Sequence, residues 1–237
     1  MKKLALTSVC AFALSIGANA QGLVNWGSIS FANFTAQTNA NNASVFTGGT
    51  AAGTGFGSMA PGAAGSFYFA LLTKANSGSQ SAQPTTIGSL SAWSATGLTA
   101  ANNAAAGRVT VIGANSGAAA AGLTPGVTKD IMMVGWSANL GTTYASAFNY
   151  LQNWATLGST VVGNAFFGTS TTGFIATVDT TTSPGVGVFG SAPTGAGTPI
   201  QSLNTQLNQL VVPVPEPATV ALASLGGLAM LALRRKK

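Results

Sequence analysis

The chain has 237 residues, which suits one domain with shorter processing segments, and only 5% of them are charged against about 25% in an ordinary soluble domain. Its formal net charge of +6 comes almost entirely from the two ends, so the region between them lacks the basic cluster that nucleic-acid binding requires. The absence of histidine and the presence of a single cysteine, Cys10, exclude histidine-based catalysis, histidine metal ligands and a disulfide within the chain.

Residues 1–20 have the three parts of a secretory signal peptide. Two lysines begin the segment, an apolar stretch follows, and Ala18 and Ala20 place small side chains at the third and first positions before a cleavage site. We therefore predict a signal helix that signal peptidase removes after Ala20, and the single cysteine would leave with it. The alternative is a buried N-terminal helix of a cytosolic protein, which would not require the spacing of Ala18 and Ala20.

The body of the chain, residues 21–212, contains short apolar runs separated by turns rich in Gly, Pro, Asn and Ser. The runs are rich in β-branched and aromatic residues, and several alternate between apolar and polar positions, which is typical of strands. They cover residues 23–34, 66–73, 108–112, 130–137, 164–170 and 173–178. This pattern predicts an all-β fold, a single β-sandwich-like domain.

One segment of the body departs from the strand pattern. Tyr144, Phe148, Leu151 and Trp154 recur at spacings of four and three residues, which places them on one face of a helix. We predict one short amphipathic helix here, crossing one edge of the sandwich.

The low charge of the body also bears on its partners. Neutral β-rich surfaces lack the charged side chains that keep edge strands from pairing with other chains. We therefore expect the body to associate with like chains or with a neutral polysaccharide.

Catalytic candidates in the body are few. Asp130 and Asp179 are its only carboxylates, and they would suit a glycosidase pair only if the fold brought them within about 5 to 10 Å of each other. Asp130 begins a predicted strand and Asp179 lies in a turn-like VDTTT sequence, so turn and capping roles are the better interpretation. Glycine-rich loops such as GTGFGS lack the lysine and the acidic partner of a nucleotide site. We predict no enzymatic activity, no metal site and no cofactor.

The tryptophans suggest carbohydrate binding, since indole faces stack on sugar rings. Trp136 and Trp154 lie in strongly apolar patterns and are predicted core residues. Trp93, in SLSAWSATG, is predicted to be more exposed and is therefore the candidate glycan contact.

The C-terminal segment, residues 213–237, reads PVPEPATVALASLGGLAMLALRRKK and has three parts. Pro215, Glu216 and Pro217 predict an extended segment, because proline disfavours a helix. Residues 218–233 carry no charge and would form a helix of about 24 Å, so they span the roughly 30 Å hydrocarbon core only marginally. The basic residues that follow should stay on the cytoplasmic side; they are Arg234, Arg235, Lys236 and Lys237.

This three-part end resembles the PEP-CTERM sorting signal, a bacterial tag recognised by exosortases. The resemblance covers only residues 213–237 and depends on the combination of the Pro-Glu-Pro motif, the apolar helix and the basic cluster. It implies that a membrane-embedded cysteine transpeptidase cuts near Pro215, Glu216 and Pro217 and removes the helix. It also implies a Gram-negative bacterium that makes exopolysaccharide. The alternative is a permanent tail anchor, for which the helix is short.

These inferences divide the chain into a signal peptide (1–20), a β-rich extracytoplasmic domain (21–212) and a sorting signal (213–237). We expect an exported, non-enzymatic structural protein that passes through the inner membrane to the cell surface or extracellular matrix. Its expected partners are signal peptidase, an exosortase and, in the assembled layer, exopolysaccharide or like chains. The alternative function is a secreted carbohydrate-binding, lectin-like module associated with exopolysaccharide.

Overall fold

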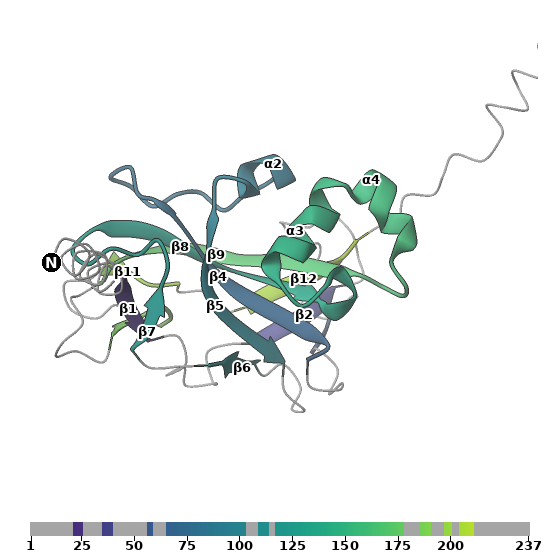
Figure 1. Ribbon diagram of the computed structural model, residues 1–237, viewed down its shortest axis with the longest axis horizontal. Coiled ribbons are helices and arrows are strands. Elements are labelled where there is room, and N and C mark those ends of the chain that lie inside the picture. The colour runs from purple at the N-terminus through teal and green to yellow at the C-terminus, as the bar shows by residue number, and fades with distance from the viewer. Residues whose placement is uncertain are drawn as a thin grey trace, which may run out of the picture.

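Long antiparallel strands make up most of the structure, together with short helices (Figure 1). The computed structural model describes residues 21–25, 35–39, 56–58, 65–102, 109–113, 117–177, 185–190, 197–200 and 204–210. The main sheet contains, in spatial order, β3 (Phe56–Ser58), β2 (Thr35–Asn39), β12 (Asn204–Gln209), β9 (Phe166–Ala176), β8 (Thr128–Ser137), β4 (Phe67–Ala75), β5 (Ser94–Asn102) and β6 (Val109–Ile112), and β11 (Gly197–Thr198) pairs with β9.

Within this sheet, the strands from β12 to β6 all run antiparallel to their neighbours and form a curled sheet of six strands. β2 extends the sheet by pairing parallel to β12. The register of β4 on β8 runs without a break from Phe67 opposite Ser137 to Ala75 opposite Lys129. β4 is therefore paired with β8 along its full length, in the middle of the sheet.

β8 is the central strand of the fold because both of its faces are buried. Every residue from Asp130 to Ser137 is buried, and the IMMVGW sequence between them is a nearly continuous apolar run. Since successive side chains of a strand point to opposite faces, Ile131 and Met133 enter one core, whereas Met132 and Val134 enter the other. An apolar run without alternation therefore marks the strand that both cores share.

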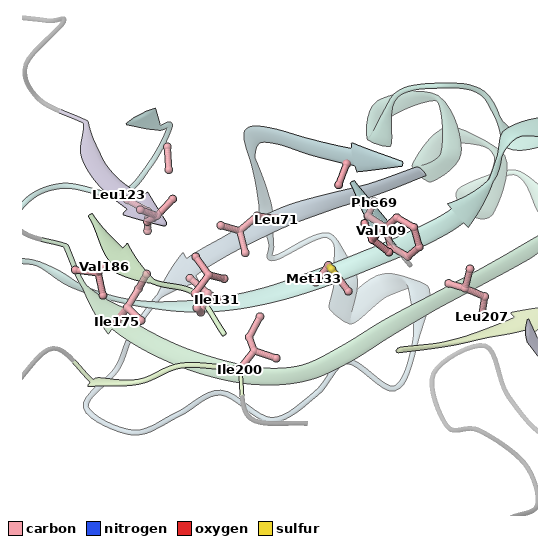
Figure 2. Packing of buried hydrophobic residues seen from close by; sticks show 14 residues of the cluster. Phe69, Leu71, Val109, Leu123, Ile131, Met133, Ile175, Val186, Ile200 and Leu207 are labelled. Atoms are coloured by element: carbon pink, nitrogen blue, oxygen red, sulfur yellow. The ribbon is translucent and has the colours of Figure 1, made fainter. Parts of the chain in front are cut away.

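A small three-stranded sheet covers the face of the main sheet that carries Ile131. Its spatial order is β10 (Val186–Gly187), β1 (Gly22–Asn25) and β7 (Ala118–Ala120). Figure 2 shows the resulting core, in which side chains of the small sheet meet those of β4 and β8. Members of this core include Val24, Ala120, Val186, Phe69, Leu71, Ile131 and Met133.

Helices contribute to the core on the opposite face. The short α2 (Ile87–Leu90) connects β4 to β5, and β8 leads through the 3-10 turn η2 (Ala138–Leu140) into α3 (Tyr144–Gln152), α4 (Trp154–Leu157) and η3 (Gly158–Thr160). Thr143 caps α3 by accepting a hydrogen bond from the Ser146 N–H. Ala147 and Leu151 of α3 are buried in the same cluster as Trp136 of β8.

The β-rich prediction is confirmed as a mostly β structure with short helices. The predicted strands at 66–73 and 130–137 correspond to β4 and β8, and the segments at 164–170 and 173–178 form the single strand β9. The division into sheets differs from a sandwich of two similar sheets, because one large curled sheet carries a small sheet on one face and helices on the other. Alternation of apolar residues identifies strands but does not say which of them share a ladder.

The helix predicted from Tyr144 to Trp154 is confirmed, although its continuity and its position differ from the prediction. Asn153 separates α3 from α4, and the helices contribute to a core on one face of the sheet instead of crossing its edge. The prediction of a single helix missed α2, which is only four residues long and too short to produce a helical period.

The signal helix at residues 1–20 and the apolar segment at 218–233 lie outside the described residues, so both stay predictions. In the part of the chain that the structure describes, no helix combines the length and the hydropathy needed to cross a membrane.

A row of aromatic rings connects the sheet to α3. The ring centroids of Tyr68 and Trp136 are 6.3 Å apart, and Trp136 is 6.2 Å from Tyr144. The row ends on Phe148, 5.6 Å from Tyr144. Trp136 Nε1–H donates a hydrogen bond to the Gly141 carbonyl at 2.8 Å. The Tyr144 hydroxyl, by contrast, is buried without a hydrogen-bond partner, and burial raises the pKa of Tyr144 above its usual value.

Tyr144→Phe is expected to raise the free energy of unfolding at neutral pH by about 1 kcal/mol, because it removes a buried, unpartnered hydroxyl and keeps the ring stacking. Since folding raises the pKa of Tyr144, the wild type keeps full stability below about pH 10, the unfolded value, and loses stability as the pH rises further. Urea unfolding across this pH range should show a smaller decline for the variant. Tyr150→Phe is the control, and an equal decline in wild type and Tyr144→Phe would contradict the assignment.

Candidate functional site

The buried carboxylate of Asp130 organises a polar cluster near the start of β8. Asp130 is 0% exposed, so its charge is removed from bulk water. Its Oδ1 accepts a hydrogen bond from Asn76 Nδ2 at 2.6 Å. Its Oδ2 accepts one from the Ser81 hydroxyl at 2.5 Å and another from the Ser81 backbone N–H at 3.2 Å. Three donors to one carboxylate offset the loss of hydration that burial imposes.

The segment between β4 and α2, residues 76–86, is bound to the sheet by side-chain amides, and we call it the strap. Gln80 Nε2 donates to the Thr172 carbonyl at 2.7 Å and to its hydroxyl at 3.0 Å. The Thr172 hydroxyl in turn donates to the Ser81 carbonyl at 2.6 Å. Further along, Gln83 Nε2 donates to the Thr169 hydroxyl at 2.8 Å. The strap is therefore attached to β8 through Asp130 and to β9 through two threonines.

The geometry of Asp130 suits a structural role better than acid-base chemistry. A general acid or base must reach the proton that it transfers, whereas Asp130 is fully buried and accepts hydrogen bonds from the strap. Asp179, the other member of the predicted pair, lies outside the described residues, so a separation suited to a glycosidase stays a prediction. Within the described ranges, no group of three or more His, Cys, Asp or Glu side chains could hold a metal ion.

Trp93 is buried, so the predicted exposure of this residue is wrong. It is 5% exposed and packs in the cluster of the helix-covered face, together with Leu90 and Met132. The Lys74 Nζ lies 5.9 Å from the centroid of the Trp93 ring, which is a cation-π contact. The polar residues around Trp93 in the sequence predicted a surface position, but α2 and the turn into β5 place the indole in the core. A buried indole offers little surface on which a sugar could stack.

The predicted processing residues lie outside the described part of the chain. They are Ala18 and Ala20 at the signal-peptidase site, and Pro215, Glu216, Pro217, Arg234, Arg235, Lys236 and Lys237 in the C-terminal segment. The last described residue before that segment is Leu210, which is 4% exposed and donates its N–H to the Ala165 carbonyl at 2.7 Å. The C-terminal segment therefore begins three residues after a position fixed in the core.

Comparison with known proteins identifies this C-terminal segment. Residues 213–236 match the family model of the PEP-CTERM protein-sorting motif. The chain carries a PEP-CTERM sorting signal. This signal confirms the resemblance seen in the sequence, and it implies an exported protein that a membrane exosortase processes. No curated protein and no solved structure is significantly similar to the chain.

Asp130→Ala is expected to lower the free energy of unfolding by about 3 kcal/mol, because the donors of Asn76 and Ser81 lose a charged acceptor. Asp130→Asn should cost about 1 kcal/mol or more, since its NH₂ group would face one of these donors. Urea unfolding measures both changes. Lys129→Gln is the control on the same strand and should stay within about 0.5 kcal/mol of the wild type. Equal stability of Asp130→Ala and Lys129→Gln would contradict the role given to Asp130.

Proposed function

We propose that the protein is a structural, non-enzymatic component of the bacterial cell surface or extracellular matrix. The observation that carries this proposal is the match of residues 213–236 to the PEP-CTERM motif, which implies export and exosortase processing. In the proposed route, a signal peptide over residues 1–20 starts export. Cleavage near Pro215, Glu216 and Pro217 then separates the β-rich body from the apolar segment that follows.

The chemistry of the body supports a structural role. Its described charged side chains are Lys74, Lys129 and Asp130, and the Asp130 carboxylate is occupied by hydrogen bonds from the strap. The amides of Gln80 and Gln83 are likewise used within the body, where they hold the strap on β9. A body whose polar groups join its own segments and whose surface carries little charge suits close packing with like chains or with a neutral polysaccharide.

A carbohydrate-binding, lectin-like role has less support, because its candidate contact, Trp93, is 5% exposed and packed in a core. Exopolysaccharide stays a proposed neighbour of the body surface as a whole. We therefore propose that the protein is part of the surface or matrix layer and has no dedicated sugar-binding site.

Mass spectrometry of the exported protein is expected to find an N-terminus at Gln21 and a C-terminus near Pro215, because the proposal places both cleavages in the export route. Alanine substitution of the whole Pro-Glu-Pro motif should leave a chain that ends at Lys237 in the membrane fraction. Pro193→Ala, outside the motif, should be processed like the wild type. Released wild-type protein that still ends at Lys237 would refute the proposed route.

Cells without the protein are expected to hold a less cohesive surface layer, measured as the shear needed to detach matrix material. Re-expression of Asp179→Asn should restore cohesion fully, because the proposal assigns no catalytic role to the carboxylates of the body. Asp130→Asn is unsuitable for this purpose, since it is expected to weaken the fold. If Asp179→Asn were sorted at the wild-type level and still failed to restore cohesion, an enzymatic function would be favoured instead.

A further inference from the structure

The chain leaves the folded body at one defined end of the main sheet. The last residues of β12 pair with the first residues of β9, with Gln209 opposite Phe166. Directly afterwards, the Leu210 N–H donates to the Ala165 carbonyl at 2.7 Å, and the Leu210 side chain is buried in the core of the helix-covered face. We call residues 157–165 together with Leu210 the exit end. The C-terminal segment must start from this position.

The exit end exposes an apolar side chain on a fixed backbone. Val162 is 88% exposed, whereas the other exposed large hydrophobic residues in the described ranges, Ile112 and Val127, reach 52% and 45%. The backbone around it is held by Asn139, whose Nδ2 donates to the Val162 carbonyl at 3.0 Å and to the Asn164 carbonyl at 3.1 Å. Val162 is therefore presented to the surroundings by an anchored loop.

The described charges lie at the opposite end of the central strands. Lys129 and Asp130 are at the start of β8. Lys74 lies at the same end, because its position in β4 is opposite Asp130 in the register of the two strands. Ser137, at the other end of β8, accepts a hydrogen bond from the Phe166 N–H at 2.8 Å and so lies beside the exit end. Ser137 lies eight positions after Lys129, which is about 26 Å along a strand. Figure 1 likewise places α3 and α4 at one end of the body and β1, β7 and β11 at the other.

The length of the connecting chain limits how far the exit end can lie from the membrane. From Leu210 to Ala218, where the apolar run begins, the chain advances eight residues and reaches at most about 29 Å. Leu210 pairs next to the start of β9, so a tether of this length holds the exit end within about 29 Å of the inserted segment.

We propose that the exit end rests on the lipid surface of the membrane while the C-terminal segment is inserted, with Val162 entering the interface. This inference rests on the proposed sorting route. A lipid surface is the fitting partner because the exit end combines an exposed valine with Gly, Ser, Thr and Asn and has no charged residue to desolvate. Trp154, half-buried at the start of α4, adds a side chain of the kind that gathers at membrane interfaces.

The test uses residues 21–237, the form that the proposed route inserts into the membrane; this chain contains no cysteine, so a single label can be placed at will. Val162→Cys carries an environment-sensitive fluorophore at the exit end, and Val127→Cys carries it at the charged end as the matched control. Each chain is reconstituted into vesicles of phosphatidylethanolamine and phosphatidylglycerol that contain a lipid-borne quencher. We expect quenching at position 162 to be several-fold stronger than at position 127. Insertion of a long Gly-Ser linker after Leu210 should remove the difference.

Equal quenching at the two positions, in chains that float with the vesicles, would overturn the lipid contact and leave the sorting route intact. Failure of the chains to float would instead contradict membrane insertion itself, and with it the proposed route. Protection of the position 162 label only in vesicles that also contain exosortase would assign this face to the enzyme and overturn the lipid proposal.

Discussion

Burial of β8 on both faces is the constraint on which the two cores depend. Its odd-numbered residues, such as Ile131, pack under the small sheet, and its even-numbered residues, such as Met132, pack on the helix-covered face. The two ends of the strand have different tasks. Asp130 at the start accepts hydrogen bonds from the strap. Trp136 near the end packs in the aromatic row that leads to α3. A single strand thus positions the elements that cover both sides of the sheet.

The attachment of the strap shows how a chain with few charges can hold an irregular segment in place. Gln80 and Gln83 bind hydroxyl and carbonyl groups of β9, and the one ionisable acceptor, Asp130, is buried. Salt screens exposed charges strongly but weakens partly buried hydrogen bonds between neutral groups much less. Such attachments suit an exported body, because they depend little on ionic strength.

The sequence predicted those parts of the fold that have a strong local signal. The apolar runs of β4 and β8 and the helical spacing from Tyr144 to Trp154 were confirmed, and Trp136 is a core residue as predicted. β5 and β12 were missed, because SATGLTAAN and NTQLNQ are polar or small and become strands only by pairing with neighbours. Trp93 was misplaced for a similar reason, since its burial depends on α2 and not on its own neighbours in the sequence.

The functional segments also differ in whether a local sequence pattern reveals them. The sorting signal could be identified from sequence because three adjacent segments with different physical properties make the pattern specific, and the family comparison confirmed it. The strap could not be foreseen, because its partners lie far along the chain; Gln80 and Thr172 are 92 positions apart. Hydrogen bonds over such distances leave no local pattern in composition or spacing.

The position of β12 in the main sheet determines when that sheet can be completed. β12 fills the place between β2, near the start of the body, and β9, near its end. Synthesis of the chain begins at the N-terminus, so this place stays empty until the last strand has been made, and the sorting signal follows β12 by only a few residues. The strand that closes the main sheet and the sorting signal are therefore completed almost together, so the body cannot close its main sheet long before the sorting signal has been made.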